Sequence, residues 1–156
     1  MPEGIAGVPL HPLVVHAVVV LLPLAAVGVI VEAVVPRWRS ALAVTVLMVT
    51  IVGTALVPVA TQSGKNLRQS LGVESLVARH ASLGQSLIFF AGPLLVAAVG
   101  LWWTERRDGD REYSASAISI TFRIVAVIIA VATIIQVVRI GHSGAEAVWS
   151  GVVPPG

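Results

Sequence analysis

The sequence predicts an all-α membrane protein, a bundle of four transmembrane helices that alternate in direction. Hydrophobic residues make up 56% of its 156 residues and charged residues only 12%, and the mean hydropathy is +0.93, which is far outside the range of soluble domains. Four apolar runs each reach the roughly 20 residues needed to cross a hydrocarbon layer of about 30 Å. We therefore expect one compact transmembrane domain over residues 1–156.

The first two spans, at about residues 13–34 and 41–60, are expected to form an antiparallel hairpin. The connection between them contains Pro36, which cannot continue a helix, and Arg37 and Arg39, which require water or lipid headgroups. No basic residue precedes the first span, so it does not resemble a cleavable secretory signal. We expect it to be retained as a helix.

The third and fourth spans are expected at about residues 81–103 and 117–140. The connection before the third span is long and polar, with scattered apolar residues that are compatible with a short interfacial helix. The connection before the fourth span, TERRDGDREYSAS, contains both positive and negative side chains, which is typical of a solvated loop. We detect no internal repeat.

The distribution of basic residues predicts the orientation in the membrane. Five arginines lie at the ends of the short connections on one side, namely Arg37, Arg39, Arg106, Arg107 and Arg111, and the other side holds Lys65, Arg68, Arg79 and Arg139. Short loops rich in Lys and Arg stay inside. Both termini are therefore expected on the outer side of the cell inner (cytoplasmic) membrane, which the chain crosses several times.

All four histidines are expected at the outer end of the bundle. His11 and His16 open the first span, His80 opens the third, and His142 follows the fourth. Helices that alternate in direction bring these positions to one end whatever the absolute orientation is. The sequence therefore predicts a histidine cluster there.

The histidines of the first span are expected to differ in environment. His11 precedes Pro12 and is expected to be a solvated helix cap or a peripheral ligand. His16 lies about one turn deeper, where an imidazole needs a partner. We therefore expect His16 to be the more important of the two.

His80 is expected to point into the bundle. On a helical wheel it shares a face with Gly84, Ala91 and Ala98, and such small residues allow neighbouring helices to approach closely. Gly84 leaves space beside the ring for a packed helix or a flat cofactor. Gly141 is expected to end the fourth helix, so the wheel does not orient His142.

Two charged residues lie within spans near the inner end of the bundle. Glu32 lies a short distance from the inner end of the first helix, and Arg123 lies about 9 Å from that of the fourth. Charges within a membrane are candidate functional groups with a partner to be identified, so we expect a Glu32–Arg123 ion pair. The alternative is that both side chains reach the inner headgroups separately.

Three stretches carry a family resemblance. They are GVPLHPLVVH (7–16), RHASLGQSL (79–87) and GHSGAEAVW (141–149). With the four spans, they resemble the bacterial membrane family catalogued as domain of unknown function 2231, over nearly the whole chain. The resemblance implies a redox role, because related domains occur fused to Rieske iron-sulfur or cytochrome modules. Its motif positions here are His11, His16, His80, His142 and Gly144.

The sequence departs from that family pattern at two places. Ala17 and Val18 follow His16 where a Phe-Pro pair is usual, and Ser150 follows Trp149 where many members have a further histidine. A site that required that extra histidine would be incomplete in this chain.

Two site chemistries are compatible with the histidine cluster. His16 and His80 could be the axial ligands of a b-type haem that passes electrons between a quinone pool and a redox partner protein. Alternatively, three or four imidazoles, among them His11 and His142, could bind zinc or copper. The absence of cysteine excludes thiolate ligands and covalent haem attachment.

A third hypothesis is a structural or assembly subunit of a membrane complex, or a homo-oligomer, without any cofactor. The sequence contains no HExxH pattern, so hydrolysis is not indicated, and whether the chain is an enzyme stays open. The basic residues are dispersed rather than clustered, which excludes a nucleic-acid-binding protein.

Overall fold

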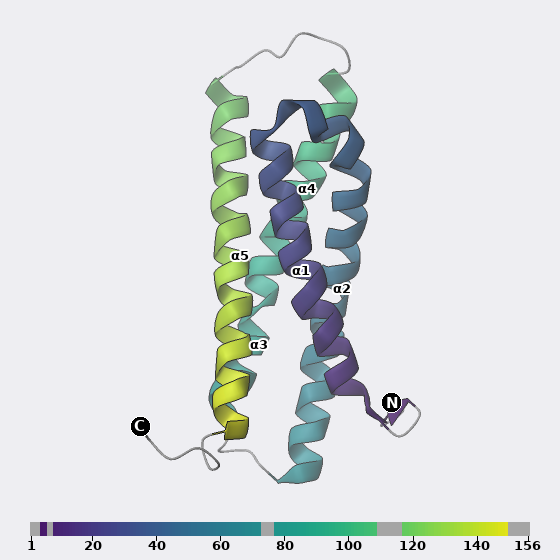
Figure 1. The fold of residues 1–156 in the computed structure, drawn as a ribbon, viewed down its shortest axis with the longest axis vertical. Coiled ribbons are helices and arrows are strands. Elements are labelled where there is room, and N and C mark those ends of the chain that lie inside the picture. Colours follow the sequence, from purple (N-terminus) through teal and green to yellow (C-terminus); the bar gives the residue numbers. More distant parts are fainter. Residues whose placement is uncertain (1–3, 6–7, 73–76, 109–116, 150–156) are drawn as a thin grey trace.

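The structure, a computed structural model, describes residues 4–5, 8–72, 77–108 and 117–149 (Figure 1). Two very short strands, β1 (Gly4–Ile5) and β2 (Val8–Pro9), pair antiparallel before the first helix. The helices are α1 (Leu10–Val34), the 3-10 turn η1 (Pro36–Trp38), α2 (Arg39–Leu71), α3 (Ala78–Ser86), α4 (Ile88–Asp108) and α5 (Ala117–Trp149).

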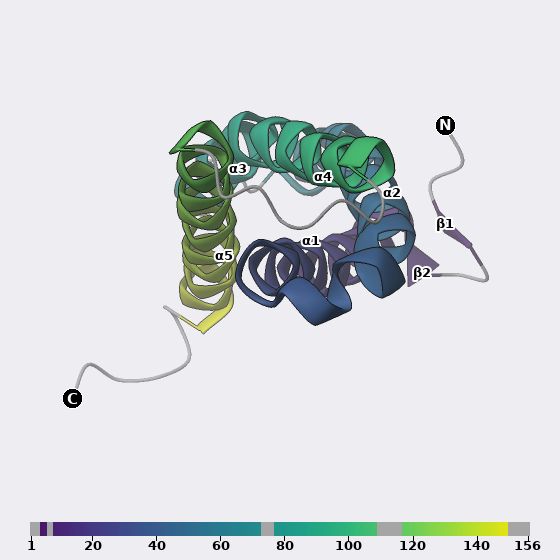
Figure 2. The ribbon, with the colours of Figure 1, turned by 90° about the horizontal axis from the view of Figure 1, so that it is seen from above.

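The long helices form a four-membered ring when the molecule is viewed along its axis (Figure 2). α1 packs against α2 and α5, and α4 packs against the same two helices from the other side of the ring. β1 and the last turn of α5 lie at the same end of the molecule (Figure 1). The four-helix transmembrane bundle predicted from the sequence is thus confirmed.

The surface and the interior both fit a lipid environment. Four segments are long and apolar enough to cross a membrane, and they are Leu10–Val34, Pro36–Ser70, Ala78–Arg107 and Ser119–Trp149. Large apolar side chains such as Phe89 (76% exposed) and Val96 (69%) lie on the outside, which only lipid or another apolar partner tolerates over such an area. The interior is rich in alanine, which lets the helices approach closely.

Two helices extend further than the predicted spans. α2 runs to Leu71 rather than to about residue 60, and α5 runs to Trp149 rather than to about residue 140. Gly141 therefore lies inside α5, and the expectation that it ends the helix is wrong. Packing explains this, because Ser143, beyond Gly141, is buried and its hydroxyl lies 3.4 Å from Nδ1 of His80 on α3, and such tertiary contacts override the low helix propensity of glycine.

The third span is broken into α3 and α4 at Leu87. The Leu87 N–H donates to the carbonyl of Gly84 at 3.3 Å, so the carbonyl of Leu83 loses its usual helical donor. Gln136 of α5 replaces that donor, because its side-chain NH₂ donates to the Leu83 carbonyl at 3.2 Å and to the Ser86 hydroxyl at 2.9 Å. α5 thus holds the short helix α3 in place at the break.

Because α1 packs closely on α2, we expect one added methyl group at their contact to lower the stability of the protein. A Cβ at Gly28 would lie 2.5 Å from Cγ2 of Val46, and Val46 is a buried, stiff β-branched residue. We expect Gly28→Ala to lower the free energy of unfolding in mixed micelles by about 1–3 kcal/mol.

Gly141→Ala on α5 is the matched control, since a Cβ there meets no atom within 4 Å. We expect it to leave stability unchanged or to raise it by up to about 1 kcal/mol through helix propensity. Equal stability of the two variants would contradict the packing of α1 against α2.

Candidate functional site

The end of the bundle at which α1 and α3 begin and α5 ends holds His11, His16, His80 and His142, and we call it the histidine end. The opposite end holds η1 and the last turn of α4, with Arg37, Arg39, Arg106 and Arg107, and we call it the arginine end. The antiparallel order of the helices separates the two groups in this way.

His11 lies in the first turn of α1 and is fixed by the last part of α2. Its Nδ1–H donates to the carbonyl of Ala60 at 3.1 Å, and the hydroxyl of Ser63 lies 3.2 Å from the same nitrogen. That hydroxyl itself donates to the Ala60 carbonyl at 3.0 Å. A Cβ at Gly64 would lie 2.8 Å from Cε1 of the ring, so glycine is needed for the ring to lie there.

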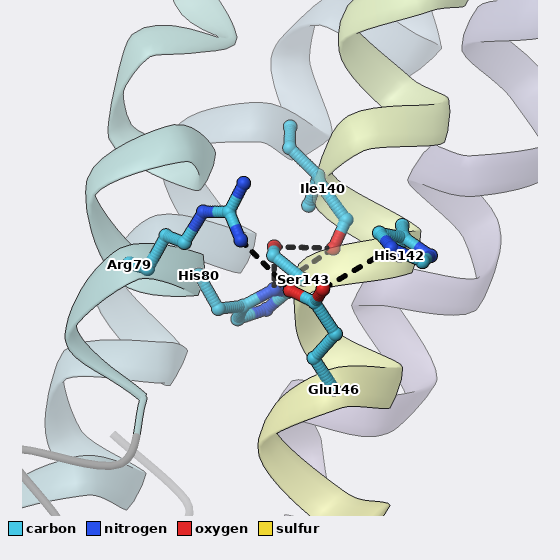
Figure 3. A network of polar contacts seen from close by, with 6 residues as sticks. All are labelled: Arg79, His80, Ile140, His142, Ser143 and Glu146. Carbon is cyan, nitrogen blue, oxygen red and sulfur yellow. Dashed lines mark hydrogen bonds and ion pairs between the residues drawn. The ribbon is translucent and has the colours of Figure 1, made fainter. Parts of the chain in front are cut away.

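His80 on α3 is held by α5 in the same way (Figure 3). Its Nδ1–H donates to the carbonyl of Ile140 at 3.0 Å, and the Ser143 hydroxyl lies 3.4 Å from that nitrogen. Ser143 in turn donates to the Ile140 carbonyl at 2.8 Å. A Cβ at Gly144 would lie 3.2 Å from Cε1 of His80. The two histidine sites therefore share one arrangement.

This correspondence is a structural repeat that the sequence analysis missed. The two hairpins are α1–α2 and α3/α4–α5. In each, a histidine lies in the first turn of the first helix, and its ring contacts a Ser-Gly pair near the end of the facing long helix. The pairs are Ser63-Gly64 and Ser143-Gly144, and these two dipeptides, each following an apolar stretch, are the signal of this repeat in the sequence. Two residues in each of two long spans are too few to be recognised as a repeat.

The hydrogen bonds determine which nitrogen of each ring is available. A carbonyl oxygen only accepts hydrogen bonds, so Nδ1 of His11 and of His80 must carry a proton. In a neutral imidazole the lone pair then lies on Nε2. A histidine whose Nδ1–H is bound to a carbonyl is the usual form of a metal-ligating histidine, because the bond fixes the ring and raises the basicity of Nε2.

His11 and His80 line the same cavity, whose volume is about 200 Å³. Its walls come from α1, α2, α3, α5 and the break at Leu87, and they are mostly apolar, with Val15, Val18, Val57, Leu87, Val137 and Ile140 among them. Gly84 also lines it, and a Cβ at Gly84 meets no atom within 4 Å. The space expected beside the His80 ring is thus open rather than filled by a helix.

His16 and His142 lie outside this cavity. His16 is exposed, and its Nδ1–H donates to the carbonyl of Pro12, one turn earlier in α1. The partner of His80 across the cavity is therefore His11 and not His16, which differs from the expectation. Side chains five residues apart on a helix point about 140° apart, so only one of the two rings can face the interior.

His142 belongs to a surface ion-pair network (Figure 3). Its Nε2 lies 3.2 Å from the carboxylate of Glu146, which also binds Arg79 of α3 at 2.8 Å. All three side chains are exposed, so the network holds α3 on α5 only weakly. Within the described residues, no group of three or more His, Cys, Asp or Glu side chains could hold a metal ion.

Glu32 at the arginine end is buried, at 2% exposure. Arg39, at the start of α2, donates from Nε to the Glu32 carbonyl at 2.7 Å and from Nη2 to the Ala33 carbonyl at 3.1 Å. Among the described residues the ion pairs are those of Glu146, and the expected pair with Arg123 is not one of them.

The two hydrogen bonds of Arg39 satisfy carbonyls in the last turn of α1, which otherwise have no donor. We expect Arg39→Met to lower the free energy of unfolding by about 1.5–3 kcal/mol, the usual contribution of hydrogen bonds from charged donors. Arg37→Met is the control, because Arg37 is exposed and only covers the ring of Trp38, and it should cost less than about 1 kcal/mol. Equal losses in chemical unfolding would contradict the role of Arg39.

The comparisons with known proteins give one match. No curated protein and no solved structure matches the chain. A family model described as "Predicted membrane protein (DUF2231)" matches residues 7–154, a range that includes both histidines of the cavity and both Ser-Gly pairs. The resemblance seen in the sequence is thereby confirmed, and the chain belongs to the DUF2231 family of membrane proteins.

Proposed function

We propose that the protein binds a b-type haem between His11 and His80 and transfers electrons in the membrane. One observation carries this proposal: two imidazoles from different hairpins line one apolar cavity, and each has its Nδ1–H fixed on a carbonyl. Haem iron takes two axial ligands, and a pair of histidines in a helix bundle is a suitable set. Compared with the sequence-based hypothesis, His11 replaces His16 as a ligand.

The chemistry of the cavity fits a porphyrin. Its walls are mostly apolar, Gly84 leaves open space beside the His80 ring, and Lys65 and Arg68 provide positive charge near the two histidines. At about 200 Å³ the cavity is smaller than the roughly 300–1,000 Å³ of typical ligand pockets. A porphyrin held by the two histidines would therefore need room beyond the cavity, and the exposed side chains of Val19, Lys65 and Gln85 line its accessible side.

The protein's own residues have defined tasks in this proposal. The Ala60 and Ile140 carbonyls hold the two rings in one tautomer, and Ser63 and Ser143 fix those carbonyls. When bound, the haem supplies one-electron oxidation and reduction. A site at the histidine end lies near one membrane surface, and the arginine bias favours the outer one, so we expect a quinone or a redox protein on that side as the partner.

Zinc or copper is a weaker alternative. A structural zinc site uses four protein ligands and a catalytic one uses three, whereas the cavity offers two imidazoles within the described residues. No specific observation favours a structural subunit without a cofactor.

An absorption spectrum of the detergent-purified protein, oxidised and then reduced with dithionite, tests the proposal. We expect a Soret band and sharp reduced α and β bands that are lost in His11→Gly and in His80→Gly, because each variant removes one axial ligand. Added imidazole should restore part of the spectrum of each variant, which separates loss of a ligand from misfolding.

His16→Gly and His142→Gly are the matched controls and should retain the bands, since both rings lie outside the cavity. A featureless spectrum from well-folded wild-type protein would overturn the proposal. Elemental analysis of the same sample would then show whether zinc or copper is present instead of iron.

A further inference from the structure

The cavity at the histidine end has a basic side in addition to its apolar walls. Lys65 and Arg68 of α2 both line it, and residues three apart lie on the same face of a helix. Among the described residues, no aspartate or glutamate lines the cavity. The described lining therefore combines an apolar interior with the two positive charges of Lys65 and Arg68.

Arg68 has a nitrogen that no group in the described part of the chain satisfies. Its Nε is buried and makes no hydrogen bond there. A charged donor that is removed from water without a partner is unfavourable. The position of Arg68 in the last turn of α2 is favourable for its charge, but the helix dipole does not supply an acceptor for Nε.

The carboxylates whose positions the structure describes are not available to Arg68. Glu146 binds Arg79 and His142 on the surface of α5. Glu32 and Glu105 lie near the ends of α1 and α4, at the arginine end of the bundle. None of the carboxylates in the described part of the chain therefore offers Arg68 an acceptor.

We propose that Lys65 and Arg68 bind the carboxylate of an amphipathic ligand whose apolar body occupies the cavity. The planar guanidinium of Arg68 matches a carboxylate in geometry, and Lys65 adds a second charge from the exposed side of the cavity. Two molecules share this chemistry, namely haem with its two propionates and a free long-chain fatty acid. The haem form rests on the function proposed above.

Titration of the full chain, freed of endogenous ligand, with two porphyrins tests the proposal. The first probe is haem, and the second is its dimethyl ester, in which both propionates are blocked. We expect Arg68→Leu to weaken haem binding by about tenfold to hundredfold, as loss of a charge-assisted hydrogen bond implies. Binding of the ester should change less than about twofold, because it offers no carboxylate.

Several comparisons sharpen this result. Lys65→Leu should show the same selectivity with a smaller effect, and Arg68→Lys should recover part of the haem affinity. Arg139→Leu is the control, because Arg139 lies at the same end on α5 but does not line the cavity. A merely structural role of Arg68 would weaken the binding of haem and of the ester equally, which would overturn the proposal.

Binding of radiolabelled oleate by the same variants separates the two ligand sources. If haem binds with a full spectrum and neither haem nor oleate binding depends on Arg68, this proposal is overturned and the proposed function stands. If haem gives no spectrum but oleate is retained and lost in Arg68→Leu, the proposed function fails and the carboxylate site holds a fatty acid. If neither ligand depends on Arg68, the carboxylate site is overturned.

Discussion

Polar groups that lie within a membrane must find hydrogen-bond partners inside the protein, and the structure of this bundle depends on that constraint. Where α3 breaks from α4, Gln136 satisfies the freed carbonyl of Leu83. Where α1 ends, Arg39 satisfies its last carbonyls. At the histidine end, His11 and His80 each donate to a carbonyl near the end of the facing long helix. Each of these bonds also joins two helices, so the contacts that satisfy polar groups also hold the helices of the bundle together.

The two hairpins satisfy the polar groups of their histidines in the same way. In each, the ring of a histidine near the start of the first span contacts a Ser-Gly pair of the facing helix. A glycine further along the same span, Gly28 on α1 and Gly100 on α4, lies against Val46 and Phe122 respectively. Both histidines then line one cavity between the hairpins. A pair of similarly held imidazoles that line one mostly apolar cavity follows from this repeated arrangement, and it is the basis of the haem proposal.

The sequence predicted the spans and the gathering of the histidines at one end, because the length of apolar runs and the alternation of helices determine both. It did not predict how α1 is rotated. Lipid-facing and buried positions of α1 are both apolar, for example exposed Val20 and buried Val18, so the pattern contains no polar face to orient the helix. His16 was therefore favoured over His11. Arg39 contacts Glu32 at its backbone carbonyl, and the sequence does not predict this contact because the reach of Arg39 back to α1 depends on the turn at η1.

The central claim is that the side chains at positions 11 and 80, rather than 16 and 80, meet in one cavity. The chain contains no cysteine, so a thiol reagent would react only with cysteines introduced by substitution. In membranes, a short bifunctional thiol reagent should join the pair His11→Cys and His80→Cys efficiently and the pair His16→Cys and His80→Cys poorly. Equal joining of the two pairs, or joining of the second pair alone, would contradict the account.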